Sequence, residues 1–515
     1  MQTDDMTIAA LWERRAAIDP GHVYCRFGED SFTIGALNER INRLANGLLA
    51  AGAKPGDRVA VMLPSHPDHI VTIFALAKAG LVRIPVNVHL KGAALDFVFD
   101  RFEPHWLIAD RDYAAVLAPA TARLPGLSVL WRGGDEPAGF AGVIAAANPA
   151  APAVKVGPDD VIAITPSSGT TGEPKGVLKT DRSLRAGPMG TLALTGAKAG
   201  DVFLLWEPLH HGAGVSVLIA ALMQPLTLAQ VDRFSASQFW DQVRRYDVTH
   251  IHYLGGVLPL LLKQPASARD REHKVRMAWG GGCPLDVWKA FEDRFGIPLH
   301  EGYGLSEMTT FVTINPEGRV GSCGRALPFY EVVLRSEDGA EVPVGEAGEI
   351  TVRPLEAGLS FIGYFRMPEA SAALMKDGWF STGDLARRDE DGFLFYAGRK
   401  KDSVRRRGVN ISAWEVERIL LTHDDIEECA LVGVPSEMGD DDLKLFIRPT
   451  GGREPDPLDL IKWCESRMPY FQIPRYIERI EEFPKTPTQR IKKSDLPRGV
   501  ENAFDLERSG YRIGK

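Results

Sequence analysis

The chain has 515 residues, of which 44% are hydrophobic and 25% charged, and its formal net charge is −8. This composition is typical of globular proteins and excludes disorder, collagen or coiled coil as a description of the whole chain. At roughly 150 residues per domain, the length suggests about three folding units. The acidic balance predicts no global attraction to nucleic acid or anionic membranes, so any polyanion must be held by a local site.

The cysteines and the N-terminus indicate a reducing compartment. Five cysteines are scattered along the chain without a CxxC pair, which argues against a disulfide framework or a zinc site. They are Cys25, Cys283, Cys323, Cys429 and Cys464. The first residues lack the basic and apolar segments of a secretory signal, and no run approaches 18 apolar residues. We therefore expect a cytoplasmic protein without a membrane span, either a monomer or a homodimer.

Helices and strands alternate in the first third of the chain. Apolar residues at helical spacing predict a helix over residues 34–48, with Thr33 as its N-cap. Residues 58–63 are predicted as a short buried strand, 69–79 as a helix and 81–88 as another strand. Strand–helix–strand order at this spacing favours a largely parallel, doubly wound sheet.

Later segments predict further strands and then a region of short strands separated by turns. Residues 203–206 and 248–253 repeat the strand signal of the first third. Beyond Gly321, short strands between glycine- and aspartate-rich turns predict a β-rich subdomain, at residues 330–335, 348–353 and 392–396.

A second domain is predicted after the basic run Arg399–Arg407 (RKKDSVRRR). There the pattern restarts with a helix at 414–421, a strand at 428–434 and a helix at 458–467. We place the boundary so that residues 1–400 form an N-terminal domain and 401–515 a C-terminal one. The last fifteen residues are predicted to be a tail or a late docking segment.

The strongest local signal is Thr165–Val177 (TPSSGTTGEPKGV), directly after an apolar strand at 161–164. Glycines let several N–H groups converge on an anion, the hydroxyls add donors, and a lysine adds charge. The spacing is not that of a Walker A loop. The alternative is a flexible polar loop. The phosphate-binding candidates are Ser167, Ser168, Gly169, Thr170, Thr171, Gly172 and Lys175.

Four further blocks follow in order along the chain. They are Glu301–Glu307 (EGYGLSE), Ser381–Asp384 (STGD), Gly398–Asp402 (GRKKD) and Gly408–Glu417 (GVNISAWEVE). With the TPSSGTTGEPKGV loop, these blocks resemble the motifs of the adenylate-forming, AMP-binding superfamily, which includes acyl-CoA synthetases, adenylation domains and luciferases. The C-terminal part is most similar to crotonobetaine/carnitine-type CoA ligases. The resemblance implies a large α/β N-terminal domain with doubly wound sheets and a β-rich subdomain, plus a small mobile C-terminal α+β domain.

The resemblance also implies roles for the nucleotide site. Tyr303 would offer an aromatic face to adenine, and Glu301 would accept from its amino group. Ser306 stands where Thr is usual and keeps a hydroxyl for the α-phosphate. Glu307 is a hard oxygen ligand suited to Mg²⁺, against the alternative of a solvated surface glutamate. Asp384, which could otherwise be a turn residue, would bind the ribose hydroxyls. The other predicted contacts with nucleotide are Gly282, Cys283, Pro284, Gly302, Gly304 and Arg399.

The acyl pocket is predicted from two segments. Pro208–Gly212 matches the family's P-x-x-H block, which implies a catalytic position for His211 near the substrate carboxylate; Thr170 of the loop is a further catalytic candidate. A metal pair is the alternative, but neighbours on a strand face opposite ways, so His210 and His211 would be poor joint ligands. Gly280 and Gly281, with Gly282, leave room for a bulky hydrophobic acid beside Trp279; the alternative is a tight loop. For His250 and His252 we favour packing.

The basic run permits three interpretations. It could be a solvated face or a nucleic-acid patch, but it coincides with the family's hinge. The resemblance makes Asp402 the pivot between two domain orientations and directs Arg405 to Gly408 toward the CoA channel. The phosphates of ATP and CoA would then account for the charge.

The chain departs from the family pattern at two places. Asp181 replaces a usual His, with unknown effect. At Thr486–Ile491 the family's catalytic T-x-x-G-K block has Gln489 and Arg490 instead of Gly and Lys. Arg keeps the charge but is planar and delocalised, so it is not a conservative substitute at a compact site. Lys492 or Lys493 could supply the missing amine after a register shift.

These observations predict an AMP-forming acid–CoA ligase acting on a bulky hydrophobic carboxylic acid, with ATP, Mg²⁺ and CoA. Three alternatives remain open. With adenylation impaired at Arg490, the chain could convert an acyl-adenylate supplied by a separate adenylating enzyme. It could be a non-catalytic nucleotide-binding protein. It could also load a carrier protein in trans.

Overall fold

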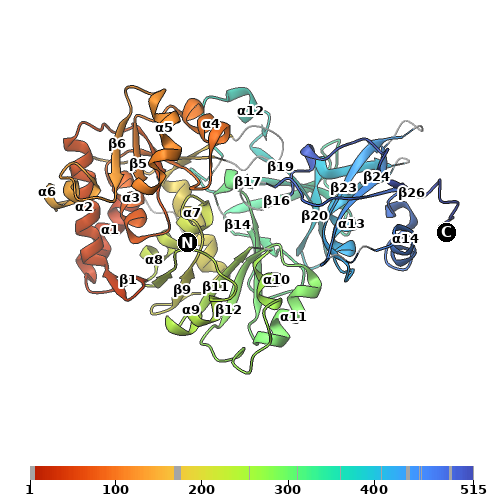
Figure 1. Cartoon of the computed structure of the whole chain (residues 1–515). Helices are drawn as coiled ribbons and strands as arrows, with labels where there is room; N and C mark the ends of the chain where they lie inside the picture. The colour runs from red at the N-terminus through yellow and green to blue at the C-terminus, as the bar shows by residue number, and fades with distance from the viewer. Residues whose placement is uncertain are drawn as a thin grey trace. The chain divides into compact units, whose positions relative to one another are not determined.

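The computed structural model describes residues 6–513, except 167–174, 255, 310, 360, 407–408, 437–440, 452, 454 and 486–489. The chain divides into two compact units. The first spans 1–167, 174–331 and 353–380, and the second spans 168–173, 332–352 and 381–515. Figure 1 shows the order of the elements along the chain. Each unit is described by itself below.

The first unit contains a six-stranded sheet in the order β6–β5–β3–β4–β7–β8. All neighbours in it are parallel except β7 and β8. Parallel strands need crossover connections, and helices supply them here. The strands are β3 (Arg58–Met62), β4 (Val82–Pro85), β5 (Trp106–Asp110), β6 (Ser128–Arg132), β7 (Val161–Pro166) and β8 (Gly176–Thr180).

A nine-stranded sheet of the same unit has the order β15–β14–β13–β12–β11–β9–β10–β1–β2. Its central strands are parallel, while β2, β14 and β15 are antiparallel to their neighbours. The bounds are β1 (Val23–Phe27), β2 (Asp30–Thr33), β9 (Val202–Leu205), β10 (Thr227–Gln230), β11 (His250–Leu254), β12 (Met277–Gly281), β13 (Leu299–Gly304), β14 (Phe311–Asn315) and β15 (Arg325–Ala326).

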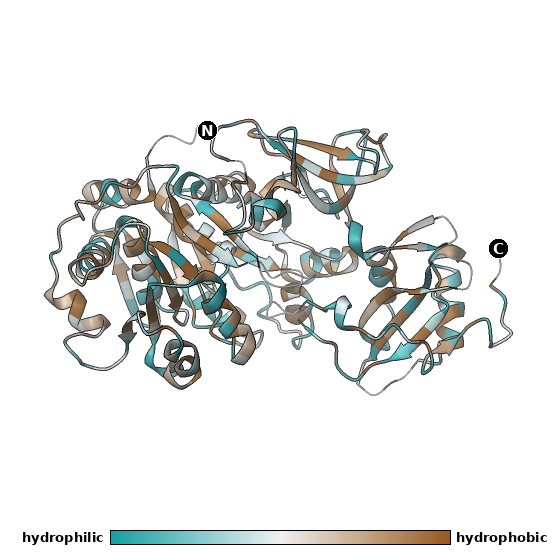
Figure 2. Cartoon of the chain, turned by 90° about the horizontal axis from the view of Figure 1, so that it is seen from above, coloured by the Kyte–Doolittle hydropathy of each residue, from teal (hydrophilic) through white to brown (hydrophobic). Residues whose placement is uncertain are grey.

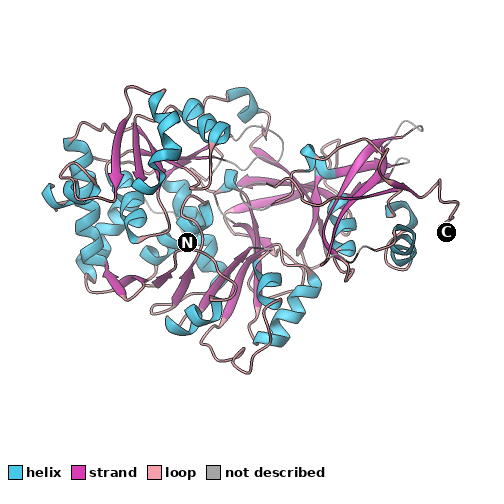
Figure 3. Cartoon of the chain, in the orientation of Figure 1, coloured by secondary structure: helices cyan, strands magenta, loops and turns pink. Residues whose placement is uncertain are grey.

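Helices cover both faces of these sheets (Figure 3). The largest core joins α1, α2, α3 and α8 to strands of both sheets, and separate cores lie under α4 and α5 and under α9 to α11. Brown, apolar colour follows the inner strands (Figure 2). The helices are α1 (Ile8–Ile18), α2 (Ile34–Ala50), α3 (Pro67–Lys78), α4 (Gly92–Phe102), α5 (Ala114–Ala122), α6 (Phe140–Ala146), α7 (Asp181–Thr195), α8 (Gly212–Met223), α9 (Phe239–Arg245), α10 (Val257–Leu262), α11 (Leu285–Phe295) and α12 (Pro368–Ala372).

The second unit is built mainly from strands. A four-stranded sheet has the order β23–β24–β25–β26, and its apolar face packs against α13 and α14. A small sheet has the order β16–β17–β19–β18, with β20 on β19; most of its residues belong to this unit, whereas β18 belongs to the first. The bounds are β16 (Tyr330–Arg335), β17 (Ala347–Pro354), β18 (Met375–Lys376), β19 (Trp379–Arg388), β20 (Leu394–Arg399), β21 (Ser403–Arg406), β22 (Val409–Ser412), α13 (Ala413–Leu420), β23 (Ile426–Pro435), β24 (Asp441–Pro449), α14 (Pro457–Glu465), β25 (Tyr476–Arg479) and β26 (Phe504–Asp505).

Most predicted elements match the observed ones. The Thr33 hydroxyl accepts from Ala36 N at 3.3 Å and caps α2, as the sequence predicts. The strand predicted at 81–88 is shorter, since β4 ends at Pro85, whose ring cannot continue the ladder. Part of the supposed tail is a strand, because β26 pairs with β25. All five cysteines are free. Among the described residues, no helix has the length and apolar character needed to cross a membrane.

Candidate functional site

The centre of the site in the first unit is a short turn after β13, the 3-10 segment η2 (Ser306–Met308). It presents Ser306 at the surface and Glu307 half-buried, the residues predicted to bind the α-phosphate and Mg²⁺. Glu307 Oε1 accepts a 2.8 Å hydrogen bond from the Tyr364 hydroxyl. Burial and the charge of Glu307 raise the pKa of Tyr364, so the phenol stays protonated as a donor.

Tyr364 also connects this turn to the phosphate loop. The ammonium of Lys175 lies 4.8 Å from the centre of the Tyr364 ring, a cation–π contact. The Tyr364 backbone is bridged to Val177 of β8. Lys175 and Glu307 therefore contact the same side chain, Lys175 at the ring and Glu307 at the hydroxyl. Mg²⁺ is usually bound by one or two carboxylates together with phosphate oxygens, and Glu307 would supply the carboxylate.

The predicted adenine wall is formed where β12 and β13 end. Glu301 is buried, and its Oε1 accepts from Cys283 N at 2.6 Å and from the Tyr253 hydroxyl at 3.2 Å. Burial raises the pKa of Glu301 to about 7. Its carboxyl therefore holds the Gly282–Pro284 segment in place, and a direct contact with adenine stays a prediction. Gly282 has φ +82°, which requires glycine.

The nearby glycines serve strand packing. A Cβ on Gly280 would lie 1.9 Å from the Tyr253 carbonyl oxygen, and one on Gly281 would lie 2.9 Å from that of Gly302. The space expected above Gly280 for a bulky acid is thus already filled by the neighbouring strand. This corrects the sequence interpretation, because close approach of β11 to β12 by itself accounts for glycine at position 280.

The histidines near the predicted acyl pocket have separate environments. His210 and His211 lie in a turn before α8, so the strand geometry assumed for them is wrong. His211 is exposed and caps α8, where its Nδ1 accepts from Ala213 N. His250 stacks on Phe203, which confirms packing. His252 packs against Trp206 and Trp279, and its Nδ1 pairs with buried Glu207, a partner that the sequence interpretation missed.

The departure at Asp181 has a structural explanation. Asp181 is the first residue of α7, and its Oδ2 accepts from Ile8 N at 2.9 Å. Its other oxygen pairs with Arg185 one turn later at 2.8 Å, and both side chains are buried. Burial raises the pKa of Asp181, while these donors oppose that shift. The carboxylate therefore ties α7 to the start of α1.

A second group of predicted residues comes together on β19 and β20. Asp384 is buried, and its Oδ1 lies 3.1 Å from Arg399 Nε and accepts from the Tyr396 hydroxyl at 3.3 Å. Burial lowers the Arg399 pKa, but Asp384, Tyr396 and Asp402 together outweigh it and raise that pKa. Arg490 belongs to the same unit, and the charges of this cluster act on it. Burial and the charge of Arg399 lower the Arg490 pKa, while Tyr396 and Asp384 oppose the shift.

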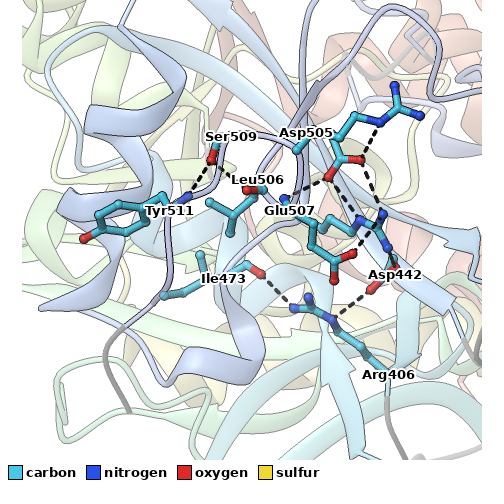
Figure 4. Close-up of polar contacts among 10 residues, drawn as sticks. Arg406, Asp442, Ile473, Asp505, Leu506, Glu507, Ser509 and Tyr511 are labelled. Atoms are coloured by element: carbon cyan, nitrogen blue, oxygen red, sulfur yellow. Dashed lines mark hydrogen bonds and ion pairs between the residues drawn. The ribbon is translucent and has the colours of Figure 1, made fainter.

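Part of the basic run is structural. Arg406 is buried, its Nε donates to Asp442 Oδ1 at 3.2 Å, and its Nη1 donates to the Ile473 carbonyl at 2.8 Å (Figure 4). Arg475 bridges Asp442, at 2.9 Å, and Asp505, at 3.2 Å. The expectation that Arg406 faces a CoA channel is therefore wrong. Strand alternation puts positions 404 and 406 on the buried face of β21.

The lysines after Arg490 are also placed. Lys493 Nζ lies 2.7 Å from Glu417 Oε1, and that carboxylate also accepts from Leu431 N. Lys493 is thus held inside the unit by α13 and β23, which argues against its replacing the missing catalytic amine. Lys492 is more exposed and lies 3.9 Å from Asp495.

Several predictions stay open. Residues 167–172, which include Thr170, and Gly408 lie outside the described residues, as does the side chain of Arg405. Asp402 ends the 3-10 segment η3 (Lys400–Asp402) inside the second unit. Its role as a pivot, and the mobile domain 401–515, remain predictions.

The structure thus forms two clusters from the predicted residues. One unit holds Lys175, Ser306, Glu307 and the residues predicted to bind adenine, and the other holds Asp384, Arg399 and Arg490. Sequence reasoning missed Tyr364, Tyr396 and Lys179. The signal for Lys179 was a lone charge on an apolar strand, on the same face as Val177.

Comparison with known proteins identifies the family. Residues 12–359 match the AMP-binding enzyme family, and residues 415–490 match the AMP-binding enzyme C-terminal domain. The chain belongs to the AMP-binding enzyme family. The predicted superfamily, the fold class and the enzyme class, an AMP-forming acid–thiol ligase, are confirmed.

Relatives extend over nearly the whole chain. A feruloyl-CoA synthase from Amycolatopsis is 31% identical, covering 94% of this chain and 97% of its own. A crotonobetaine/carnitine–CoA ligase from Salmonella arizonae is 30% identical, covering 95% and 97%. The ATP-bound structure of MatB from Rhodopseudomonas palustris has a TM-score of 0.86 at 26% identity, covering 94% and 97%. The anthranilate CoA ligase AuaEII, in complex with anthranoyl-AMP, shares the fold with a TM-score of 0.87 at 22% identity, covering 96% and 98%.

Proposed function

We propose that the chain joins a bulky hydrophobic carboxylic acid to CoA. The acid attacks the α-phosphate of ATP, which gives an acyl-adenylate and pyrophosphate. The CoA thiol then attacks the acyl carbon and AMP leaves, so no side chain has to act as a covalent nucleophile. Mg²⁺, when bound, would neutralise phosphate charge and orient the pyrophosphate leaving group.

The observation that carries this proposal is the Lys175–Tyr364–Glu307 array beside Ser306. Tyr364 contacts the Lys175 cation and the Glu307 carboxylate, and Ser306 adds a hydroxyl, a set of groups that suits a magnesium-bound triphosphate. In the second unit, the Asp384 carboxylate suits the ribose hydroxyls, with Arg399 and Arg490 able to meet phosphate or carboxylate charge.

Support for the class of acid comes from the relatives. Trp206 and Trp279, which contact His252, are buried core residues and do not themselves argue for a bulky substrate. The feruloyl-CoA synthase relative is named for an aromatic acid, in agreement with a bulky substrate. Gly280 no longer supports this choice, because its space is filled.

We further propose that Arg490 performs the adenylation role despite the change from Lys, which makes the enzyme complete. No relative named above supports a purely thioester-forming enzyme or a non-catalytic binder. CoA as thiol substrate, a cytoplasmic location, rotation about Asp402 and contacts of Arg405 and Gly408 with CoA belong to the same proposal.

A two-arm assay on the purified protein tests the function. One arm supplies ATP, Mg²⁺ and a panel of aromatic and long-chain acids and follows pyrophosphate release. The other supplies preformed acyl-adenylates and CoA and follows acyl-CoA. Activity in both arms with bulky acids is the expected result. Activity in the second arm alone would overturn the role of Arg490, and a preference for acetate would overturn the class of acid.

A further inference from the structure

One buried cation of the first unit has no place in the reaction described so far. Lys179 lies on β8, four residues after Lys175, and its exposed fraction is only 3%. Its ammonium donates to the Ser306 carbonyl oxygen and, at 2.8 Å, to the Thr309 hydroxyl. Both acceptors are neutral oxygens at the two ends of one turn.

That turn is conformationally demanding. Thr309 has φ +69°, a left-handed value that is rare and costly for a β-branched residue. Its N–H donates to the same Ser306 carbonyl at 3.1 Å. Ser306 is one of the two points that Lys179 holds, and Glu307 lies between Ser306 and the other point, Thr309. An unclamped turn could relax at Thr309 and move both functional side chains.

The burial of this lysine has no evident benefit for folding alone. Taking an ammonium out of water is costly when its hydrogen-bond partners carry no charge. An apolar side chain beside Val177 would continue the core of β8 without that cost. Burial lowers the pKa of Lys179 to about 7, and the charge of Glu307 opposes that shift and so favours the ammonium.

We propose that Lys179 is a positioning residue, which clamps the Ser306–Thr309 turn and so sets the Ser306 hydroxyl and the Glu307 carboxylate for magnesium-bound ATP. This inference rests on the proposed function, since it gives a purpose to a residue outside the predicted motifs. Lys179 does not itself touch the reacting atoms.

The test is Lys179→Met, which keeps the length of the side chain and removes its donors. ATP binding is measured by equilibrium dialysis over a Mg²⁺ titration, without any acid. We expect the Kd for ATP to rise about tenfold, the effect of losing a charged, buried hydrogen-bond donor. The Mg²⁺ midpoint should rise with it, while the rate from preformed acyl-adenylate and CoA stays within about threefold.

A matched control is available in the same unit. Lys78 on α3 is equally buried, at 3%, and donates to Asn38 Oδ1 at 2.6 Å, to Asn42 Oδ1 at 2.7 Å and to the Glu13 carboxylate. Because it also loses an ion pair, Lys78→Met should cost at least as much stability as Lys179→Met, without changing the Mg²⁺ midpoint. Thr309→Val, which removes one acceptor of the clamp at nearly constant shape, should raise the ATP Kd about threefold.

The outcomes separate the two proposals. If Lys179→Met weakens ATP binding no more than Lys78→Met, or lowers both arms of the assay equally, the clamp is overturned. If the wild-type protein binds ATP but converts no acid, the proposed function is overturned. The ATP-binding data for the variants then decide by themselves whether Lys179 clamps the turn. Absence of ATP binding in the wild type overturns both.

Discussion

The network around Asp442 in the second unit and two strands of the first unit, β4 and β8, give their cations different partners. In the second unit, buried Arg406 and half-buried Arg475 are matched by the carboxylates of Asp442 and Asp505. In the first unit, some buried cations also have a carboxylate partner, as Arg185 has Asp181, but Lys179 on β8 hydrogen-bonds to a carbonyl and a hydroxyl, and Arg83 on β4 donates to the Leu209 carbonyl at 3.0 Å. A carboxylate partner cancels the charge and makes the pair a structural tie. A neutral partner fixes the cation in place but leaves its field available to an anion.

The largest expected effect on stability is that of replacing Asp442. Replacing it by Ala leaves the buried guanidinium of Arg406 without its carboxylate, and removing one partner of a buried ion pair costs about 3–5 kcal/mol. Urea unfolding followed by far-UV circular dichroism should show this loss. ATP binding at low denaturant should be unchanged, and weakened ATP binding would show that the network also serves the site.

Substitution of Arg490 tests whether a cation near Asp384 takes part in the reaction. Arg490→Ala should lower pyrophosphate release about 100-fold, the usual cost of losing an aimed charge in the transition state. The arm fed with acyl-adenylate and CoA should change less than threefold.

Arg490→Lys restores the family's usual residue and should retain adenylation. Equal losses in both arms for Arg490→Ala would show instead that the arginine holds the second unit together.

Uncancelled charge in the first unit also predicts a pH dependence. His69 is buried near Arg83, and burial lowers its pKa to about 3, below the 6.5 of the unfolded chain. Below pH 6.5, His69 therefore becomes protonated in the unfolded chain but stays neutral in the folded protein. The free energy of unfolding should fall by about 1.4 kcal/mol per pH unit between pH 6.5 and 3 from this group.

Urea titrations across that range measure the slope, and His69→Gln should make it shallower. An unchanged slope in the variant would assign the acid sensitivity elsewhere, with His210 as the next candidate because its pKa is also lowered to about 3.

The smallest expected effect concerns the neutral link to Glu307. Tyr364→Phe removes one 2.8 Å hydrogen bond and keeps the ring under Lys175, so the ATP Kd should rise about threefold. Tyr364→Leu, which also removes the cation–π contact, should weaken binding further. No difference between the two variants would mean that the ring contributes nothing to holding Lys175.

Much of the fold and of the site was predictable because local patterns carry it. The helix at 34–48 with its Thr33 cap, the strand at 58–63 and the strand at 428–434 follow from periodicity and capping. The candidate residues Lys175, Ser306, Glu307, Asp384 and Arg490 follow from motifs in a recognisable order. These signals lie within single elements, so they can be recognised without knowing what packs against what.

Tertiary structure decided what each charge and each glycine does. The sequence has no means of telling Arg406, which pairs with Asp442, from its neighbours in a basic run. It likewise could not show that Tyr253 fills the space above Gly280, or that Asp181 holds the start of α1. Lys179 was missed for the same reason, since its partners lie about 130 residues away along the chain. A side chain's function depends on the partner that folding brings to it, and those partners come from other strands.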